Sequence, residues 1–376
     1  MLKETKIKMN NEEKKRFIVD IHRLYMELRP YDGDFPLEIM KKKEDFMWEI
    51  FKDIFYCKQP KTLYKYRKFN EQNISNLEND IAWFSKPVEF GDIVDFTINT
   101  DIETELEDFE KHPQKYTKKV AIAFIIFWLR QYGQTVDENM IDMILSLFND
   151  NGEVSEDDAK AFLKDKMPQY SSDVYSKKLF EATQLPNQAQ TKEAIKGFLK
   201  IYLDFNNKLR KESFVFCLAE EGNNQAMWET YADDATGFCI EYQIPNDTFL
   251  GQRMLMNLLP IYYGEKESII FFDALVKGLT AEKQVNGISY EDYEKWFLSS
   301  YTKDPSYAFQ KEWRIVFAQD MGGNKQSFPF VKSIILGEKI SEENKKILVD
   351  LANKKGFEIY QRKLNLSGSK IMVVKL

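Results

Sequence analysis

The chain contains few of the side chains that bind zinc or act as thiolate nucleophiles. Its 376 residues include two histidines and three cysteines: His22, His112, Cys57, Cys217 and Cys239. The cysteines show no paired spacing, which argues against a disulfide framework or a thiolate metal cage and suits a reducing cytoplasm. Both histidines lie in charged helical segments, so a Ser-His-Asp, Cys-His or His-rich zinc site is hard to assemble. We therefore predict no metal cofactor, and chemistry that uses carboxylates, arginine, tyrosine, serine and backbone groups.

The chain also lacks an excess of positive charge and a long apolar run. Lys and Arg number 53 against 60 Asp and Glu, a formal net charge of −7. Binding of a polyanion as the main activity would need a basic excess. The longest apolar run, 120–129, is far shorter than the roughly 20 residues that cross a bilayer, and the charged amino terminus lacks the apolar core of a signal peptide. The sequence predicts a cytoplasmic protein without a membrane partner.

Helical periodicity dominates the first part of the chain. Hydrophobic residues make up 43% and charged residues 30%, the balance of a globular protein. Apolar residues recur at helical spacing over 11–29 and about 36–56, separated by the helix-breaking RPYDGDFP. We predict an N-terminal helical hairpin within 1–60.

The pattern then alternates, as in strands. LYKYRKF (63–69) and IAWFSKP (81–87) flank a short predicted helix. Further strands are predicted in FVFCLAE, GFCIEYQIP, FQKEWRIVFAQ and FVKSIILGEKI, whereas 101–210 returns to helical periods. We predict an α+β fold with a central, mainly antiparallel sheet and flanking helices. Its core domain comprises 61–100 and 211–376, and 101–210 is a helical insert.

Glu312 in FQKEWRIVF is the most informative carboxylate. The alternation predicts a strand over 309–317 in which Gln310, Glu312 and Arg314 share one face. Three polar side chains in step indicate a partly enclosed polar face, where an acid can orient a hydroxyl or stabilise a cation. The alternative is a structural ion pair made by Glu312 or Arg314.

Other candidates lie at predicted strand ends. Arg67 ends LYKYR, where it could clamp a phosphate or carboxylate with two parallel hydrogen bonds. Ser85 in WFSKP could donate to a ligand, although serine is also common in turns. Trp228 and Tyr231 share one side of a predicted helix, a stripe more typical of core packing.

Six motifs resemble a known family when taken together. LYKYR, WFSKP, FGDIVDF, CLAEEGNNQAMWETYADDATGFCIEY, EWRIVF and VKSIILG occur in this order. As a set they resemble the bacterial domain-of-unknown-function family numbered 2971, over roughly 62–100 and 214–340. The chain departs from the family pattern where Gly91-Asp92-Ile93 replaces Asn-Asp-Pro, at Ala219, and where Glu229-Thr230 replace Ser-His. The resemblance implies a fold more than an activity.

A second, shorter similarity is to ADP-ribosyltransferases. That family has Arg or His on a first strand, Ser or Tyr on a second and Gln/Glu-x-Glu on a late strand, and the chain has these types in this order. The resemblance implies that NAD is the substrate, cleaved through a cation-like transition state that a carboxylate stabilises. It implies that Glu312 and Gln310 are catalytic. It also implies four NAD-binding residues: Arg67, Ser85, Tyr64 and Tyr231. The acceptor would be a protein or nucleic acid, in a defence or toxin-like effector.

These roles require a specific geometry. Arg67, Ser85 and Glu312 must lie on the same open face of a sheet, with an aromatic ring within stacking reach. Ser85 is expected to brace Glu312, and Tyr64 or Tyr231 to stack on the nicotinamide.

Two other functions are compatible with the sequence. One is a non-enzymatic sensor or interaction module of a bacterial defence or regulatory system, because helical inserts often bind partner proteins. The other is a metal-dependent nuclease that uses Asp92, Asp95 and either Glu229 or Glu241.

Overall fold

The computed structural model divides into two compact units. It describes residues 9–28, 37–99, 102–113, 116, 122, 125, 126, 129, 140, 143, 144, 146–148, 154–183, 188–268, 284–285, 288–317, 322–365, 367 and 371–376. The first unit, here called the sheet unit, comprises Met1–Thr97, Asn207–Lys266 and Ser300–Leu376. The second, the helical unit, comprises Ile98–Asn206 and Glu267–Ser299. From the sequence we assign 267–299 to the core domain, whereas in the structure these residues belong to the helical unit. Nothing in their local pattern indicates which unit they pack in.

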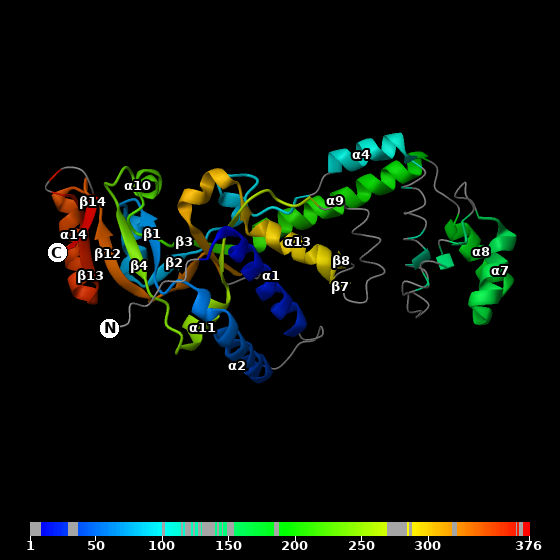
Figure 1. Ribbon diagram of the computed structural model, residues 1–376, viewed down its shortest axis with the longest axis horizontal. Helices are drawn as coiled ribbons and strands as arrows, with labels where there is room; N and C mark the ends of the chain where they lie inside the picture. The colour runs from blue at the N-terminus through cyan, green and yellow to red at the C-terminus, as the bar shows by residue number, and fades with distance from the viewer. Residues whose placement is uncertain are drawn as a thin grey trace. The chain divides into compact units, whose positions relative to one another are not determined.

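An eight-stranded sheet forms the centre of the sheet unit (Figure 1). Its strands, in chain order, are β1 (Leu63–Arg67), β3 (Phe214–Ala219), β4 (Phe238–Tyr242), β5 (Leu258–Pro260), β10 (Glu312–Phe317), β12 (Val331–Leu336), β13 (Glu358–Leu364) and β14 (Ile371–Lys375). Their order across the sheet is β14-β13-β12-β4-β1-β3-β10-β5. Neighbours pair antiparallel except β12 and β13. The predicted α+β fold with a mainly antiparallel sheet is confirmed.

The parallel pair within this sheet follows from a helical crossover. Helix α14 (Glu342–Lys355) connects β12 to β13, as a parallel connection requires. Ser341 caps its N-terminus by accepting from the Asn344 amide, and Gly356 ends it at φ 75°. Both signals were predicted from the sequence, since a left-handed residue after a helix favours glycine.

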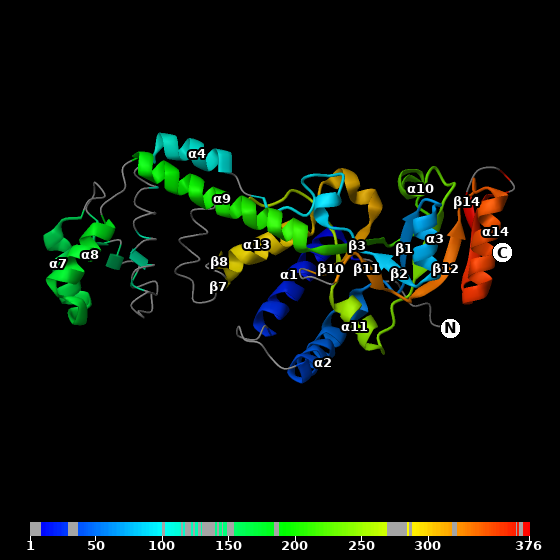
Figure 2. The same ribbon diagram turned by 180° about the vertical axis from the view of Figure 1, so that it is seen from behind.

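The sheet carries apolar packing on both faces. On one face, Tyr66, Cys239 and Ile335 pack with Trp228 of α10 (Gln225–Tyr231). The other face is aromatic: Phe216 packs against Phe84, whose ring centroid lies 5.2 Å away, and against Phe328 at 5.1 Å. Phe84 follows β2 (Ile81–Trp83), which pairs with β11 (Lys325–Ser327) in a separate small sheet (Figure 2).

The two predicted N-terminal helices are present. They are α1 (Asn11–Leu28) and α2 (Leu37–Ile54). Phe17 of α1 packs edge-on against Trp313 of β10, with ring centroids 5.9 Å apart. Alternation places Trp313 on the face of β10 opposite Glu312, so the helical pair covers the side of this strand away from the polar residues.

The remaining elements of the sheet unit are short. They are η1 (Tyr56–Lys58), α3 (Glu71–Glu78), η2 (Pro87–Glu89), α11 (Phe249–Met256), β6 (Tyr262–Tyr263), β9 (Thr302–Lys303) and η4 (Pro305–Gln310). Strands β6 and β9 pair parallel. No helix within the part of the chain described is long and apolar enough to cross a membrane.

The helical unit has its own apolar core. Its described elements include α4 (Ile102–Lys111), α7 (Glu156–Lys166), η3 (Pro168–Tyr170), α8 (Asp173–Thr183), the strand pair β7 (Gln284–Val285) and β8 (Ile288–Ser289), and most of α9 (Gln188–Glu212) and α13 (Tyr290–Ser300). Ile125, Ile126, Ile144 and Leu163 are fully buried within one cluster. Helices α4, α7 and α8 and most of α9 lie within the predicted 101–210 segment, so its described residues are largely helical.

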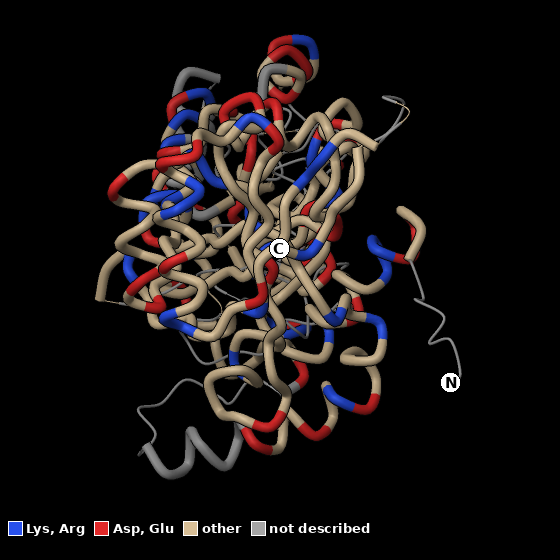
Figure 3. The backbone as a smooth tube through the Cα atoms, turned by 90° about the vertical axis from the view of Figure 1, so that its left-hand side faces the viewer, with Lys and Arg blue, Asp and Glu red and all other residues tan. Residues whose placement is uncertain are grey.

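One predicted strand is shorter than its pattern suggested. The strand expected over 309–317 begins at Glu312, because η4 runs to Gln310 and Lys311 adopts a left-handed conformation with φ 43°. Gln310 therefore belongs to a 3₁₀ turn and not to the strand. Figure 3 shows Lys and Arg intermixed with Asp and Glu along the backbone, in line with the near balance of charges.

Candidate functional site

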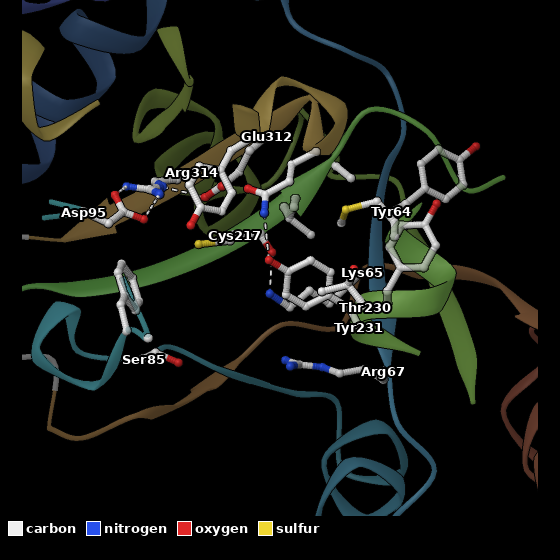
Figure 4. A pocket seen from close by; sticks show the side chains of 18 of the residues that line it. Tyr64, Lys65, Arg67, Ser85, Asp95, Cys217, Thr230, Tyr231, Glu312 and Arg314 are labelled. Carbon is white, nitrogen blue, oxygen red and sulfur yellow. Dashed lines mark hydrogen bonds and ion pairs between the residues drawn. The ribbon is translucent and has the colours of Figure 1, made fainter. Parts of the chain in front are cut away.

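The sheet unit contains a pocket of about 660 Å³. It is lined by all six residues assigned to catalysis or NAD binding from the sequence: Tyr64, Arg67, Ser85, Tyr231, Gln310 and Glu312. Figure 4 labels all of these except Gln310. They come from β1, the segment after β2, α10, η4 and the start of β10. The structure thus brings them to one pocket, but the expectation that Arg67, Ser85 and Glu312 share one face of the sheet is wrong. Tyr64 and Glu312 both lie opposite Ala219, so alternation along β1 places Arg67 on the other face, and Ser85 lies outside the eight-stranded sheet.

The pocket lies where β1 and β3 separate. Strand β3 pairs with β10 along its whole length, but the register with β1 matches only Tyr64 with Ala219 among the described residues. Nearer its start, β3 forms a bridge with Ser85: the amides of Ser85 and Val215 each donate to the other's carbonyl at 2.9 Å. Between these two attachments the edge of β3 is open at Cys217.

A lysine side chain occupies this open edge. The Lys65 ammonium donates to the Cys217 carbonyl oxygen at 2.6 Å, which satisfies a backbone acceptor that a strand partner would otherwise bind. Burial raises the pKa of the Cys217 thiol to about 12, so this side chain remains a thiol and is a poor nucleophile.

Glu312 belongs to a buried network of four charges. Its two carboxylate oxygens accept from Arg314 Nε at 2.5 Å and from Lys303 Nζ at 3.0 Å. Asp95 accepts two bonds from the Arg314 guanidinium, at 2.9 and 2.7 Å, and lies 3.4 Å from Lys303 Nζ. All four residues are buried. The network contains two cations and two carboxylates, so its formal charges balance.

These contacts keep Glu312 ionised. Burial by itself would raise the pKa of Glu312, but attraction to Arg314 and Lys303 outweighs it and lowers that pKa well below the usual range. Burial and Arg314 act in the same opposed way on the pKa of Asp95, which is also lowered. We expected Ser85 to brace Glu312, but the contacts that hold Glu312 come from Arg314 and Lys303.

Gln310 connects this network to α10. Its side-chain amide donates to the Tyr231 hydroxyl at 2.7 Å, and its carbonyl oxygen accepts from Lys303 at 2.8 Å. Burial raises the pKa of Tyr231, so its hydroxyl stays protonated at neutral pH. The Tyr231 side chain is nevertheless 41% exposed. Its hydroxyl is therefore anchored while part of its ring is accessible.

Tyr64 is fixed on the opposite side of β1 from Lys65. A Cβ atom placed on Gly222 would lie 2.5 Å from its ring, so the ring packs directly against the glycine backbone. Its hydroxyl lies 3.5 Å from Glu241, a long hydrogen bond. Of the two proposed stacking residues, Tyr231 is the one whose hydroxyl is fixed by a hydrogen bond from Gln310.

The acids of the proposed nuclease site take part in other contacts. Asp92 accepts from the Val94 amide at 3.0 Å in a turn, and Asp95 is paired with Arg314. Glu229 accepts from Gln225 at 2.8 Å, and Glu241 accepts from Ser333 at 2.6 Å. Within the described residues, His, Cys, Asp and Glu form no group of three or more that could hold a metal ion. The geometry gives the nuclease alternative no support.

Lys303 and Lys65 are two lysines whose contacts organise the pocket, and neither was singled out from the sequence. Lys303 lies in a two-residue strand in no recognisable motif, and nothing local to it signals its role. Lys65 did carry a signal, since alternation in LYKYR places it on the same side of β1 as Arg67.

Comparison with known proteins finds a match to a family model over part of the chain. The model of a family described as a protein of unknown function, DUF2971, matches residues 227–315. The match includes Tyr231, Lys303, Gln310, Glu312 and Arg314, and it confirms the resemblance to this family over that stretch. It states no activity and lends no support to the similarity with ADP-ribosyltransferases. No curated protein and no solved structure matches the chain.

Proposed function

We propose that this pocket binds and consumes NAD, as an ADP-ribosyltransferase or NAD glycohydrolase acting in the cytoplasm as a bacterial defence effector. The observation that carries the proposal is convergence. Six residues chosen for this chemistry, from segments up to about 250 positions apart, line one pocket, and the carboxylate among them, Glu312, is ionised.

The proposed reaction breaks the bond between nicotinamide and the ribose. Nicotinamide leaves with the bonding electron pair, and water or an acceptor hydroxyl adds to the ribose carbon and releases a proton. Glu312 would orient a ribose hydroxyl and stabilise the cation-like transition state. Because Arg314 and Lys303 already balance its charge, we expect orientation to be its larger contribution. Tyr231 would stack on the nicotinamide, and Gln310 would bind the ribose or the acceptor.

The test is incubation with NAD and measurement of free nicotinamide by chromatography. Glu312→Gln keeps the size of the side chain and removes its charge, so we expect turnover to fall by about 100-fold, as when one preorganised electrostatic group is lost. Glu338→Gln is the matched control, because Glu338 also pairs with a buried arginine, Arg362, at 2.9 Å but does not line the pocket. Absence of nicotinamide release by the wild-type protein would refute cleavage of NAD.

Stability must be measured on the same samples. Glu312→Gln weakens the buried network, so thermal melting should report how much of each preparation is folded. If turnover per folded molecule is unchanged, Glu312 is a structural ion-pair residue and not a catalytic one.

A second candidate function is recognition of the same ligand without catalysis. It is favoured by one observation: both carboxylate oxygens of Glu312 already accept hydrogen bonds from cations. A sensor of this kind would bind NAD or ADP-ribose in calorimetry and release no nicotinamide.

A further inference from the structure

We propose that Lys65 and Arg67 together form an anion-binding subsite at the open edge of β3, which binds a phosphate group of the ligand. The proposal rests on the proposed function only for the identity of the ligand, NAD. It assigns the substrate class as phosphorylated compounds and adds Lys65 as a binding residue.

The first argument is the missing negative partner. Lys65 contacts a carbonyl oxygen, that of Cys217, and its ammonium lies 5.2 Å from the centroid of the Phe216 ring. Within the described chain, no carboxylate lies within ion-pair distance of Lys65 or Arg67. A half-buried ammonium without a counter-ion is unusual, because charged groups that lose water are usually paired.

The second argument is the direction of the two side chains. Lys65 and Arg67 are two residues apart on β1, so both project from the same side of the strand. In Figure 4 the Arg67 guanidinium extends from β1 into the pocket, toward the side where Ser85 lies. The three residues can therefore present an ammonium, a guanidinium and a hydroxyl to one group, the donor set that suits phosphate oxygens.

The third argument is electrostatic. Burial and, to a smaller extent, repulsion by Arg67 together lower the pKa of Lys65 to about 8. Burial also lowers the pKa of Arg67. Each cation is thus less stable in the folded pocket than in water, whereas the nearby Lys303 has its pKa raised by Glu312 against the effect of burial. An anion bound between Lys65 and Arg67 would reverse this penalty.

Other charged residues of the pocket do not supply that anion. Glu89 accepts from the Lys86 amide at 3.2 Å, and Asp92 accepts from the Val94 amide. Each of these carboxylates is thus engaged by a backbone amide of its own turn, and neither forms an ion pair with Lys65 or Arg67. Asp95 and Glu312 are balanced by Arg314 and Lys303.

Calorimetry with four probes tests the subsite: ADP-ribose, inorganic pyrophosphate, adenosine and nicotinamide. We expect ADP-ribose and pyrophosphate to bind, and the two uncharged probes to bind at least about tenfold more weakly. Lys65→Met and Arg67→Gln should each weaken ADP-ribose binding by about 10- to 100-fold, the effect of losing a hydrogen bond to a charged group. Their affinity for adenosine should be unchanged.

Lys68→Gln is the matched control. Lys68 lines the same pocket but is 60% exposed and lies 3.6 Å from Asp233. We expect its loss to change ADP-ribose affinity by no more than about twofold, as for exposed charges. If Lys65→Met behaves like Lys68→Gln, or if neither ADP-ribose nor pyrophosphate binds, the subsite does not exist.

A pH series separates charge from shape. ADP-ribose affinity should fall as the pH rises through about 8, because the Lys65 ammonium loses its proton. Lys65→Arg keeps the charge at higher pH and should remove this dependence. An affinity that falls equally in both proteins would contradict a role for the Lys65 charge.

The outcomes also distinguish the two proposals. Binding of pyrophosphate that depends on Lys65, without binding of NAD or ADP-ribose, would leave the subsite and eliminate the proposed NAD function. Nicotinamide release that is insensitive to Lys65→Met and Arg67→Gln would support the proposed NAD function and eliminate the subsite.

Discussion

Two groups of charged side chains line the same pocket, and the protein treats them in opposite ways. In the Asp95–Lys303–Glu312–Arg314 network, every charge touches a charge of opposite sign. Lys65 and Arg67, by contrast, have only neutral surroundings at contact distance among the described residues, such as the Cys217 carbonyl. The first arrangement is that of a structural unit. The second is the arrangement we expect of groups that bind an anionic ligand, because charged groups with perturbed pKa values cluster at functional sites.

The comparison also explains the shifts in acidity. Lys65 and Lys303 are lysines in one pocket, but the pKa of Lys65 is lowered and that of Lys303 is raised. Burial acts in the same direction on both. The difference comes from Glu312 and Asp95, which compensate for the burial of Lys303.

The largest effect is expected from breaking the network at its centre. Arg314→Met would leave the Asp95 and Glu312 carboxylates with Lys303 as their remaining cation. Removing one partner of a buried ion pair costs about 3–5 kcal/mol, so urea unfolding should show a loss of this size. Lys354→Met is the control, because its partner Glu78 and Lys354 are both largely exposed, and the cost should stay below about 1 kcal/mol. Equal losses in both variants would show that the network is not structural.

The next effect compares the two pocket lysines directly. Lys303→Met removes a partner of Glu312 and Asp95 and should lower the free energy of unfolding by about 3 kcal/mol. This is the lower end of the range for a broken buried ion pair, because Arg314 still pairs with both carboxylates. Lys65→Met removes an uncompensated cation, so stability should be unchanged or higher. A water molecule in the pocket would then donate to the Cys217 carbonyl oxygen in place of the lysine. Thermal melting of the two variants side by side is sufficient. A large destabilisation by Lys65→Met would mean that its bond to Cys217 is structural.

The contrast between these groups also marks what the sequence could predict. Alternation in LYKYR places Lys65 and Arg67 together, and the polar run Gln310, Glu312, Arg314 indicates a polar site near β10. Local patterns of this kind follow from strand geometry. Helix start and stop signals, which are also local, correctly predicted α14 with its caps. The mainly antiparallel character of the sheet was predicted correctly as well.

What could not be predicted depends on distant contacts. Arg314 and Asp95 are 219 residues apart, and no local pattern shows that they meet. The left-handed turn at Lys311, which ends the 3₁₀ helix before β10, carries no glycine to signal it. The separation of β1 from β3, which opens the pocket, depends on where Ser85 bridges Val215. Tertiary packing decides all three.

The smallest expected effect is on the pH dependence of stability. A lysine whose pKa is lowered in the folded state costs stability wherever it is protonated, and the cost disappears as the pH rises from the folded value toward the unfolded one. The pKa of Lys65 is about 8 in the folded protein, against 10.5 for an ordinary lysine in the unfolded chain. Between about pH 8 and 9.5 the unfolded state binds more protons at this site, so its contribution should make the wild-type protein more stable as the pH rises.

The gain should be on the order of 1 kcal/mol, since one pKa unit corresponds to about 1.4 kcal/mol and Lys65 is partly screened by solvent. Urea unfolding at several pH values should show it in the wild type, and Lys65→Met should lack it. Measurements must stop below about pH 9.5, because buried tyrosines such as Tyr66 and Tyr263 have pKa values raised by burial and begin to oppose the gain above that point. If the wild type and Lys65→Met have the same slope, Lys65 is not a strained cation. A functional difference between Lys65 and Lys303 would then have to be shown by ADP-ribose binding and not by stability.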